Sequence, residues 1–463
     1  MPREITKNFI DQLRAAIIAG NEGFIVEQVK DMYPADIAEI FDELKPQQAS
    51  YFYTLLDIKL GAEVLVELEE DVREKFLASL TSKEIAENFI DNMDSDDAAD
   101  VIAELPNKVQ GEVLSMLEDT EQASDIVDLL KYDENTAGGL MATELVQVQI
   151  NNTALECVKE IRKQSEVVKN MYSVYVVDGE KLVGLLSLKK LVISPVRSIV
   201  ADICDTNIIS VRTDMEAEEV ANIMDRYDLV VLPVVDHLGR LVGRITIDDV
   251  VDVRREEETE DLQKMAGMQS LDEPYSTIPL FQMIKKRAGW LIILFLGETL
   301  TATAMSFFEG QIEKAVILAL FVPLIISSGG NTGSQAATLI IRALALGEVK
   351  ITDWWTIVKR EFAVGLTLGV MLGIIGFFRV AAWSYFIESY GPHWYLIACT
   401  VGTSLIGVVC WGTLVGSILP LGLKRLGLDP AVSSTPFVAT LVDVTGIIIY
   451  FSFALLFLKG VLL

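Results

Sequence analysis

The sequence that decides the architecture lies near the C-terminus and reads TPFVATLVDVTGIIIYFSFALL over residues 435–456. About 20 largely apolar residues cross the hydrocarbon core of a bilayer, so a membrane-spanning helix is expected within 431–458. Asp443 lies about halfway along it, where an ionised carboxylate costs about 3 kcal/mol or more. Such a residue usually marks an ion path, although a protonated Asp bonded to a neighbouring helix would also explain it.

A backbone carbonyl on the same helical face could share a cation with Asp443. Ala439 precedes Asp443 by one helical turn, and Pro436, which lacks an N–H, is expected to free a carbonyl at this level. Carbonyl and carboxylate oxygens are the ligands that hard cations prefer. Glu298, in another apolar stretch, is a weaker candidate, because an interfacial position would explain it equally well.

Five apolar stretches are long enough to span a membrane: 288–308, 315–345, 361–386, 394–420 and 431–458. Basic residues cluster before the first, between the second and third, and between the fourth and fifth. The positive-inside rule therefore places the N-terminus in the cytoplasm and, with five spans, the C-terminus outside. We expect a multi-pass protein of an inner or plasma membrane.

The second of these spans is too polar to be a simple anchor, since it contains SSGGNTGSQ at 327–335. Lipid cannot hydrogen-bond these groups, so they must face protein or a water-filled cavity. Close packing through small residues would explain the glycines. It would not explain Asn331 and Gln335, so a cavity-facing role is favoured.

Charge is divided unequally along the chain of 463 residues, which has 66 acidic and 38 basic side chains. Residues 1–284 hold 57 of the acidic and 26 of the basic residues, whereas the rest is nearly neutral. An acidic soluble half therefore precedes an apolar half, which excludes a single globular domain. Nucleic acid is also excluded as the main partner, because its phosphates would be repelled. The natural counter-ion of the first half is a cation.

The cysteines and the N-terminus bear on compartment and cofactor. The four cysteines form no CxxC or Cys/His set, which argues against zinc and a disulfide framework. The N-terminus lacks the apolar core of a secretory signal, so the acidic half is expected to stay in the cytoplasm.

The acidic half divides into a helical and a repeated part. Residues 1–133 have apolar residues at helical spacing, as in an all-α solenoid. Within 134–254, VYVVDGEKLVG (174–184) recurs as LPVVDHLGRLVG (232–243). Each copy predicts strand, turn, strand and helix, the α+β pattern of a tandem cystathionine-β-synthase (CBS) pair. The boundaries predicted for the two repeats are 134–200 and 201–254.

CBS pairs often bind adenine nucleotides through a Ser/Thr-x-x-Asp step that holds the ribose. The second repeat has Thr246 and Asp249 at this spacing, but the first has Ser187 and Lys190. Lysine cannot accept a hydrogen bond from a ribose hydroxyl, so an adenine-nucleotide site is only a secondary expectation. The sequence has no Walker A loop and no nucleophile–base pair, and we do not expect an enzyme.

The segment 255–278 is expected to be a connecting helix that begins in the acidic run RREEETEDL (254–262). This run adjoins Asp248, Asp249 and Asp252. Crowded like charges oppose a compact arrangement unless a cation intervenes. Magnesium, abundant in the cytoplasm, is the expected cation.

The arrangement resembles the MgtE family of magnesium channels over essentially the whole chain, through GGNTG (329–333), PFVATLVD (436–443) and TED (259–261). The resemblance implies a homodimer in a lipid bilayer, with an all-α pore domain of five helices at 279–463. Mg2+ would be both substrate and regulator. Asp443 of both chains and the Ala439 carbonyl would surround a hydrated Mg2+, with Asn331 beside the same path.

The resemblance further implies that Mg2+ bridges acidic residues outside the membrane and holds the connecting (plug) helices against the pore. Thr435 stands where similar sequences often have Asn, so an outer-mouth site is expected to differ. The implied metal ligands are Asp96 and Asp100 of the helical domain, Glu216, Glu218, Asp228, Asp249 and Asp252 of the second repeat, Glu257, Glu260 and Asp261 of the connecting helix, and Asp429 before the fifth span.

Two other functions are compatible with the sequence. An ion-coupled carrier that exchanges a divalent cation for sodium or protons would also use a buried carboxylate. A membrane-anchored nucleotide sensor would use the CBS pair. Selectivity among magnesium, manganese, cobalt and nickel is not determined, because all accept oxygen ligands.

Overall fold

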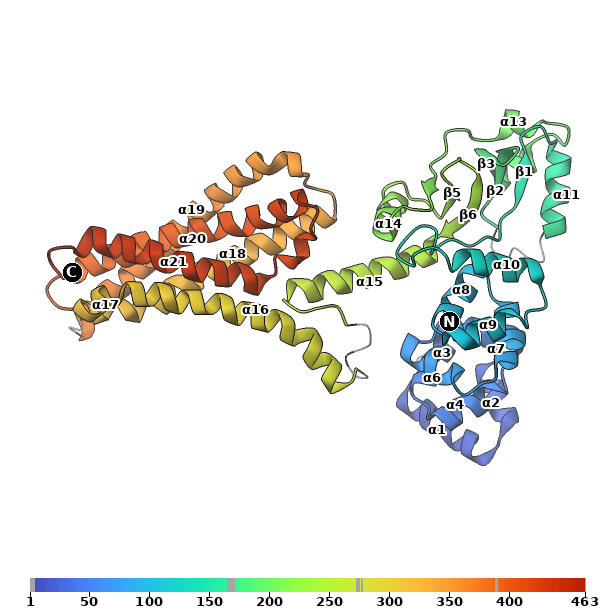
Figure 1. The fold of residues 1–463 in the computed structure, drawn as a ribbon, viewed down its shortest axis with the longest axis horizontal. Coiled ribbons are helices and arrows are strands. Elements are labelled where there is room, and N and C mark those ends of the chain that lie inside the picture. The colour runs from blue at the N-terminus through green and yellow to red at the C-terminus, as the bar shows by residue number, and fades with distance from the viewer. Residues whose placement is uncertain (1–4, 165–170, 272–274, 276–277, 388–389, 463) are drawn as a thin grey trace. The chain divides into compact units, whose positions relative to one another are not determined.

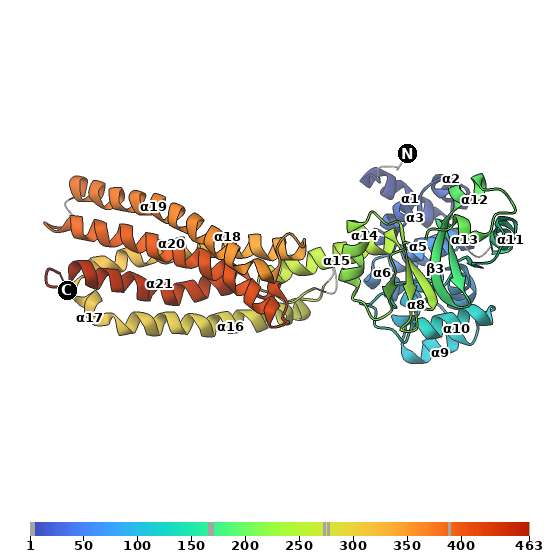
Figure 2. The same ribbon diagram turned by 90° about the horizontal axis from the view of Figure 1, so that it is seen from above.

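The computed structural model describes residues 5–164, 171–271, 275, 278–387 and 390–462. They form two compact units, 1–256 and 257–463. The first unit combines short helices with two small sheets, and the second is a bundle of long helices (Figures 1 and 2).

Short helices build the first part of the first unit, and side-chain oxygens cap several of them at the N-terminus, for example Thr6 and Thr81. Helices this short are marginal alone, so packing must stabilise them. The expected all-α N-terminal region is confirmed. Its helices are α1 (Lys7–Ala19), α2 (Glu22–Val29), α3 (Pro34–Asp42), α4 (Pro46–Tyr53), α5 (Ile58–Val66), α6 (Glu70–Leu77), α7 (Ser82–Asn88), η1 (Ile90–Asn92), α8 (Ser95–Ala103), α9 (Asn107–Leu114) and α10 (Thr120–Leu129).

The predicted duplication is confirmed as two three-stranded sheets with the same topology. In each, the first strand pairs in parallel with the second, which pairs antiparallel with the third. Both antiparallel pairs shift register at equivalent positions, Val176/Val177 and Val234/Val235. The elements are β1 (Gln147–Gln149), α11 (Ala154–Gln164), β2 (Ser173–Asp178), β3 (Lys181–Ser187), α12 (Leu188–Ile193), α13 (Val200–Ile203), β4 (Val211–Arg212), α14 (Ala217–Arg226), β5 (Val231–Val235), β6 (Leu241–Thr246) and α15 (Ile247–Met265).

The second CBS repeat shares one hydrophobic core with the N-terminal helices, whereas the first repeat has a core of its own. Ser95, the first residue of α8, is fully buried and hydrogen-bonds to the segment that follows the N-terminal helices. Its backbone N–H donates to Glu144 Oε1 at 3.0 Å, and its hydroxyl accepts from the Thr143 N–H at 2.9 Å. These contacts fix α8 against residues 143–144, in the segment that leads into β1.

Among the described residues of the second unit, five helices are long and apolar enough to cross a membrane, as expected. The first begins at Leu280 rather than 288, and the third candidate span begins at Ile351 rather than 361. These helices begin before their apolar cores, so their first two turns carry basic residues such as Lys285 and Lys359. The elements are α16 (Leu280–Phe307), α17 (Glu309–Lys314), η2 (Val316–Phe321), α18 (Val322–Ala345), η3 (Ile351–Asp353), α19 (Trp354–Ile387), α20 (Trp394–Arg425), η4 (Pro430–Val432) and α21 (Thr435–Leu458).

Helix α20 is the centre of this bundle and packs against α18, α19 and α21, while α16 lies along α21 (Figure 2). Glycines let α18 and α20 approach until their backbones touch. A Cβ on Gly412 would collide with the carbonyl of Gly329, and a Cβ on Gly416 with the carbonyl of Gly333. Small-residue packing therefore accounts for these glycines of the polar run.

We predict that Gly416→Ala destabilises the membrane bundle by about 1–3 kcal/mol, because the added methyl group must displace the backbone of α18. Gly422→Ala, in the same helix, is the matched control, since a Cβ there meets no atom within 4 Å. Thermal unfolding of the purified full-length protein in detergent measures both. Equal midpoints for the two variants would contradict the packing described above.

Candidate ion path and metal-binding residues

Asp443 lies in α21 opposite the glycine-rich stretch of α18. A Cβ on Gly330 would lie 3.5 Å from the Ala439 Cβ and 3.7 Å from Asp443 Oδ1. Asp443 is half-buried, and Glu298 of α16 is near enough to repel it electrostatically. Among the described residues no group donates a hydrogen bond to the Asp443 carboxylate. The alternative of an Asp bonded to a neighbouring helix therefore finds no support within one chain.

The polar side chains of α18 divide between two faces. Gly329 and Gly333 contact α20, whereas Asn331 and Gln335 are exposed one turn apart. Within the part of the chain that the structure describes, the Asn331 amide reaches only Ser327 Oγ, at the long distance of 3.5 Å. An exposed amide face inside a membrane requires water or another polypeptide beside it.

The expected role of Pro436 is wrong, because it lies in the first turn of α21, where a backbone N–H has no partner within the helix in any case. Its own carbonyl accepts a hydrogen bond from Thr440 Oγ1 at 3.0 Å. Proline thus frees no carbonyl at the level of Asp443. The Ala439 carbonyl still has a second lone pair for a cation, as every carbonyl does.

Thr435 lies at the end of the membrane bundle that contacts Met265, and its expected place at an outer mouth stays a prediction. Its hydroxyl donates to the carbonyl of Met265, the last residue of α15, at 3.3 Å. Its own carbonyl accepts from Ser334 Oγ at 3.1 Å. Thr435 therefore joins α18 and α21 to the end of α15, on the side of the bundle where the connecting helix arrives.

The expected connecting segment continues α15 without a break through Met265. Near its end, Lys264 Nζ lies 2.5 Å from Glu260 Oε1 and 2.8 Å from Asp429 Oδ2, in the loop before α21. Partial burial lowers the pKa of Lys264, but the hydrogen bonds to both carboxylates outweigh it and raise the pKa overall. Two expected metal ligands are thus already paired with an ammonium group of the same chain.

The same end of α15 is fastened to α16 and α21. Gly267 has φ +78, a conformation that glycine adopts readily, and packs against the Trp290 ring. The Trp290 indole N–H donates to Ser434 Oγ at 2.9 Å. The Gln269 N–H donates to the Lys286 carbonyl at 3.1 Å.

In the first unit, the acids of α8 and the start of α15 come into electrostatic range of one another. Burial raises the pKa of Asp96 well above its usual range, and Asp97 and Asp249 raise it further. Asp100 keeps contact with solvent, but partial dehydration raises its pKa to about 7 against the opposing effect of Arg73. Burial also raises the pKa of Asp249 to about 6.

Four further acids join this group without having been predicted. Burial, with repulsion from Asp252, raises the pKa of Glu67 and of Glu256. Burial also raises the pKa of Glu70. Glu134 raises the pKa of Glu70, Asp100 and Glu256 by electrostatic repulsion. These residues lie far apart in the sequence, so only the tertiary structure brings them together.

A fixed cation already lies at the edge of this group. Arg73 pairs with Glu104, with Nε 2.9 Å from Glu104 Oε2, and Nη1 donates to the Val66 carbonyl at 3.1 Å. Both side chains are only 14% exposed. Arg73 therefore pairs directly with Glu104 and also lowers the pKa of Asp100 and of Glu70 against the effect of burial.

The remaining expected ligands of the second repeat lie at opposite ends of α14. Glu216 and Glu218 lie at the start of α14, and Asp228, with φ 52, lies beyond its end, about 15 Å away along the helix axis. Glu257 and Asp261 lie on α15. Within the described ranges, no three Asp, Glu, His or Cys side chains are arranged to hold a metal.

The Thr246-x-x-Asp249 step forms the first turn of α15. The Thr246 backbone N–H and hydroxyl both donate to Asp249 Oδ2, at 3.1 and 2.9 Å. At the equivalent place in the first repeat, Ser187 Oγ accepts from the Lys190 N–H at 3.3 Å. The motif is thus a helix cap in both repeats.

We predict that, without metal, α8 becomes less stable as pH rises from about 4 to about 7. The native state binds the Asp100 proton more tightly than the unfolded chain does, so the free energy of unfolding falls across this window. Asp100→Asn should flatten the pH dependence and strengthen the protection of α8 at pH about 8.

Protection factors from hydrogen exchange of the full-length protein in chelator measure this effect. Asp31→Asn, at an exposed carboxylate after α2, is the control. If Asp100→Asn and the control respond equally to pH, the electrostatic cluster does not act as described.

Comparison with known proteins identifies the chain. It matches the MgtE family (divalent cation transporter) over 322–453, the MgtE intracellular N domain over 32–135, and CBS domains over 137–195 and 200–256. Magnesium transporter MgtE of Thermus thermophilus is 37% identical over 97% of this chain and 98% of its own length. Magnesium transporter MgtE of Enterococcus faecalis is 34% identical over 72% of this chain and 71% of its own length.

A solved structure of the cytosolic domain of the Mg2+ channel MgtE in complex with ATP covers 53% of this chain and 99% of its own. Its sequence identity is 34% and its TM-score 0.50. The chain therefore belongs to the MgtE family of divalent cation transporters.

Proposed function

We propose that the chain is a magnesium channel in which ions pass Asp443 and cytosolic Mg2+ controls opening. The observation that carries the proposal is the Asp443 carboxylate, half-buried in an apolar helix without a hydrogen-bond donor among the described residues. Such a group is costly in a membrane unless a cation or water meets it. An oxygen-only site of Asp443 and the Ala439 carbonyl suits a largely hydrated Mg2+.

A second copy of the chain completes the proposed pore. Asn331 and Gln335 form an exposed amide face on α18, and α16 has no residue buried within its own chain. In a homodimer, the amide face of α18 could line an aqueous path, and α16 could be covered by the second chain. The proposed orientation has the N-terminus in the cytoplasm and the C-terminus outside. Adenine nucleotide at the CBS pair is a secondary proposal, and catalysis is not proposed.

We expect Asp443→Ala to reduce Mg2+ uptake by cells at least about tenfold, the effect of losing ~1.4 kcal/mol of ion stabilisation. Asp443→Asn should have an intermediate effect, because it keeps one oxygen ligand but loses the charge. Glu348→Gln, at an exposed acid after α18, is the control and should transport normally. Undiminished Mg2+-selective flux in both Asp443 variants would exclude the proposed path.

Regulation is proposed to act through repulsion among the acids of α8 and α15. Hydrated Mg2+ ions would neutralise the acids around Asp96, Asp100 and Asp249 without a preformed cage of three ligands among the described residues and would favour the compact arrangement. Loss of Mg2+ would release that arrangement. At the far end of α15, Lys264 already performs this role for Glu260 and Asp429. The metal-sensitive part of α15 is therefore its beginning, and its end is held permanently.

We predict that Mg2+ increases the hydrogen-exchange protection of residues 247–256 much more than that of residues 260–265 in the wild-type protein. In Lys264→Met the two carboxylates lose their partner, so protection of 260–265 in chelator should fall and become Mg2+-dependent. Lys285→Met, at an exposed lysine of α16, should resemble wild type. Exchange that is independent of Mg2+ throughout α15 would contradict the gating proposal.

A further inference from the structure

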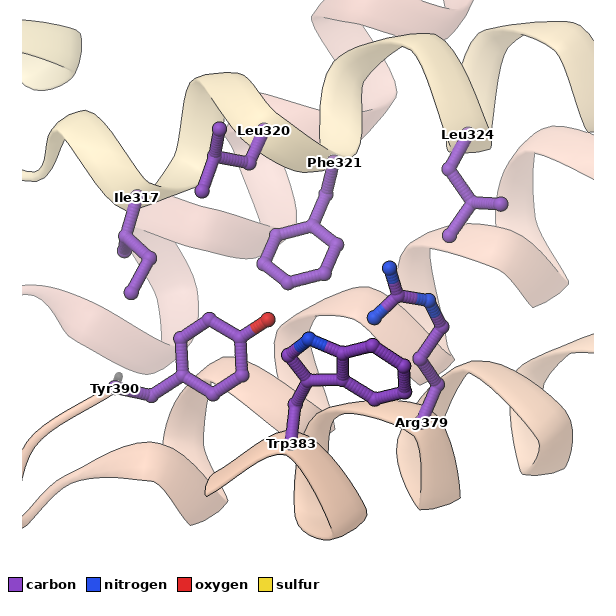
Figure 3. Close-up of a pocket in the computed structure, with 7 residues that line it drawn as sticks. All are labelled: Ile317, Leu320, Phe321, Leu324, Arg379, Trp383 and Tyr390. Atoms are coloured by element: carbon purple, nitrogen blue, oxygen red, sulfur yellow. The ribbon is translucent and has the colours of Figure 1, made fainter. Parts of the chain in front are cut away.

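A cavity of about 390 Å³ opens between η2, the start of α18 and the last turns of α19. Figure 3 shows its walls: Leu320, Phe321 and Leu324 lie on one side, Arg379 and Trp383 on the other, and Tyr390 lies at one end. Most of the lining is apolar, yet one full positive charge enters it. This combination sets it apart from the small-residue contacts inside the bundle.

Three polar groups converge on the middle of this cavity. In Figure 3 the Arg379 guanidinium, the Trp383 indole nitrogen and the Tyr390 hydroxyl all point toward the space below the Phe321 ring. The guanidinium carbon lies 4.4 Å from the centre of the Trp383 ring, which holds the cation in place. Arginine and tryptophan only donate hydrogen bonds, so an anion with several acceptor oxygens is the matching ligand.

The position of Arg379 in a candidate membrane span favours such an anion. Within the part of the chain that the structure describes, no carboxylate pairs with Arg379, and its side chain is exposed. A positive charge in this position is costly unless it reaches an interface or an anion. Arg379 lies eight residues before the end of α19, about 12 Å along the axis, a depth from which a long side chain can reach the headgroup region.

We propose that this cavity binds one phospholipid, with its phosphate on Arg379, Trp383 and Tyr390. An acyl chain would lie along Leu320 and Leu324. A free phosphate ion would leave these apolar walls exposed, and a neutral lipid would leave the arginine unpaired. Charge-assisted, bidentate contacts are the form in which arginine binds phosphate most strongly. The proposal is independent of magnesium transport.

Native mass spectrometry of the full-length protein in uncharged detergent tests the proposal, with phosphatidylglycerol as the probe. Arg379→Gln should reduce the bound lipid at least about tenfold, which corresponds to ~1.4 kcal/mol. Trp383→Phe should weaken binding to a smaller extent, because it keeps the ring but loses the N–H. Arg379→Lys should restore part of it. Arg360→Gln, at an exposed arginine near the other end of α19, should bind as wild type.

Two competitors and one cross-link complete the test. Diacylglycerol with the same acyl chains and inorganic phosphate should each fail to displace phosphatidylglycerol. Unchanged binding by Arg379→Gln overturns the proposal, and so does displacement by either competitor. A cross-link between cysteines introduced at Leu324 in two chains would show that a second copy covers the cavity, which also overturns it. A thermal midpoint of Arg379→Gln equal to wild type shows that lost binding does not reflect unfolding.

Discussion

The backbone contact between α18 and α20 is the constraint on which the membrane unit depends. Because Gly329 and Gly333 press directly against Gly412 and Gly416, α18 cannot rotate without a collision. That fixed rotation leaves Asn331 on the open side of α18. It also places Gly330 of α18, which has no side chain, against α21 at the level of the Asp443 carboxylate. The packing and the chemistry of the path therefore follow from the same glycines.

Outside the membrane, the balance between acids and fixed cations differs from place to place. Lys264 joins two carboxylates at the end of α15, and Arg73 pairs with Glu104 beside α8. Where such a basic partner is present, the local arrangement needs no metal. Around Asp96 and Asp249, burial raises the pKa values of both carboxyl groups, and the neighbouring carboxylates raise them further. A mobile divalent cation has its largest effect where the fixed charges are missing.

Patterns along the chain predicted the coarse organisation, because apolar length and a duplicated motif are local signals. The five spans, the helical region and the CBS pair are confirmed. Asp443 was predicted as a site from its position alone, and its role stays a prediction. The pairing of Lys264 with Asp429 spans 165 residues and leaves no local signal. The role expected for Pro436 failed because the residue that begins α21 could not be located from propensity.

The absence of a preformed cage of three ligands among the described residues bears on how such a sensor would work. Changing a two-state population from 1:99 to 99:1 requires about a 10⁴-fold difference in metal affinity between the states, ~5.5 kcal/mol. A single weak, hydrated site contributes only a small part of this difference in binding free energy. Four sites that each favour the compact state about tenfold together reach the required value, at ~1.4 kcal/mol each. Carboxylates spread from Glu67, just after α5, over α6, α8 and α15 are therefore better suited to a steep response than one tight site, which would stay occupied at low Mg2+.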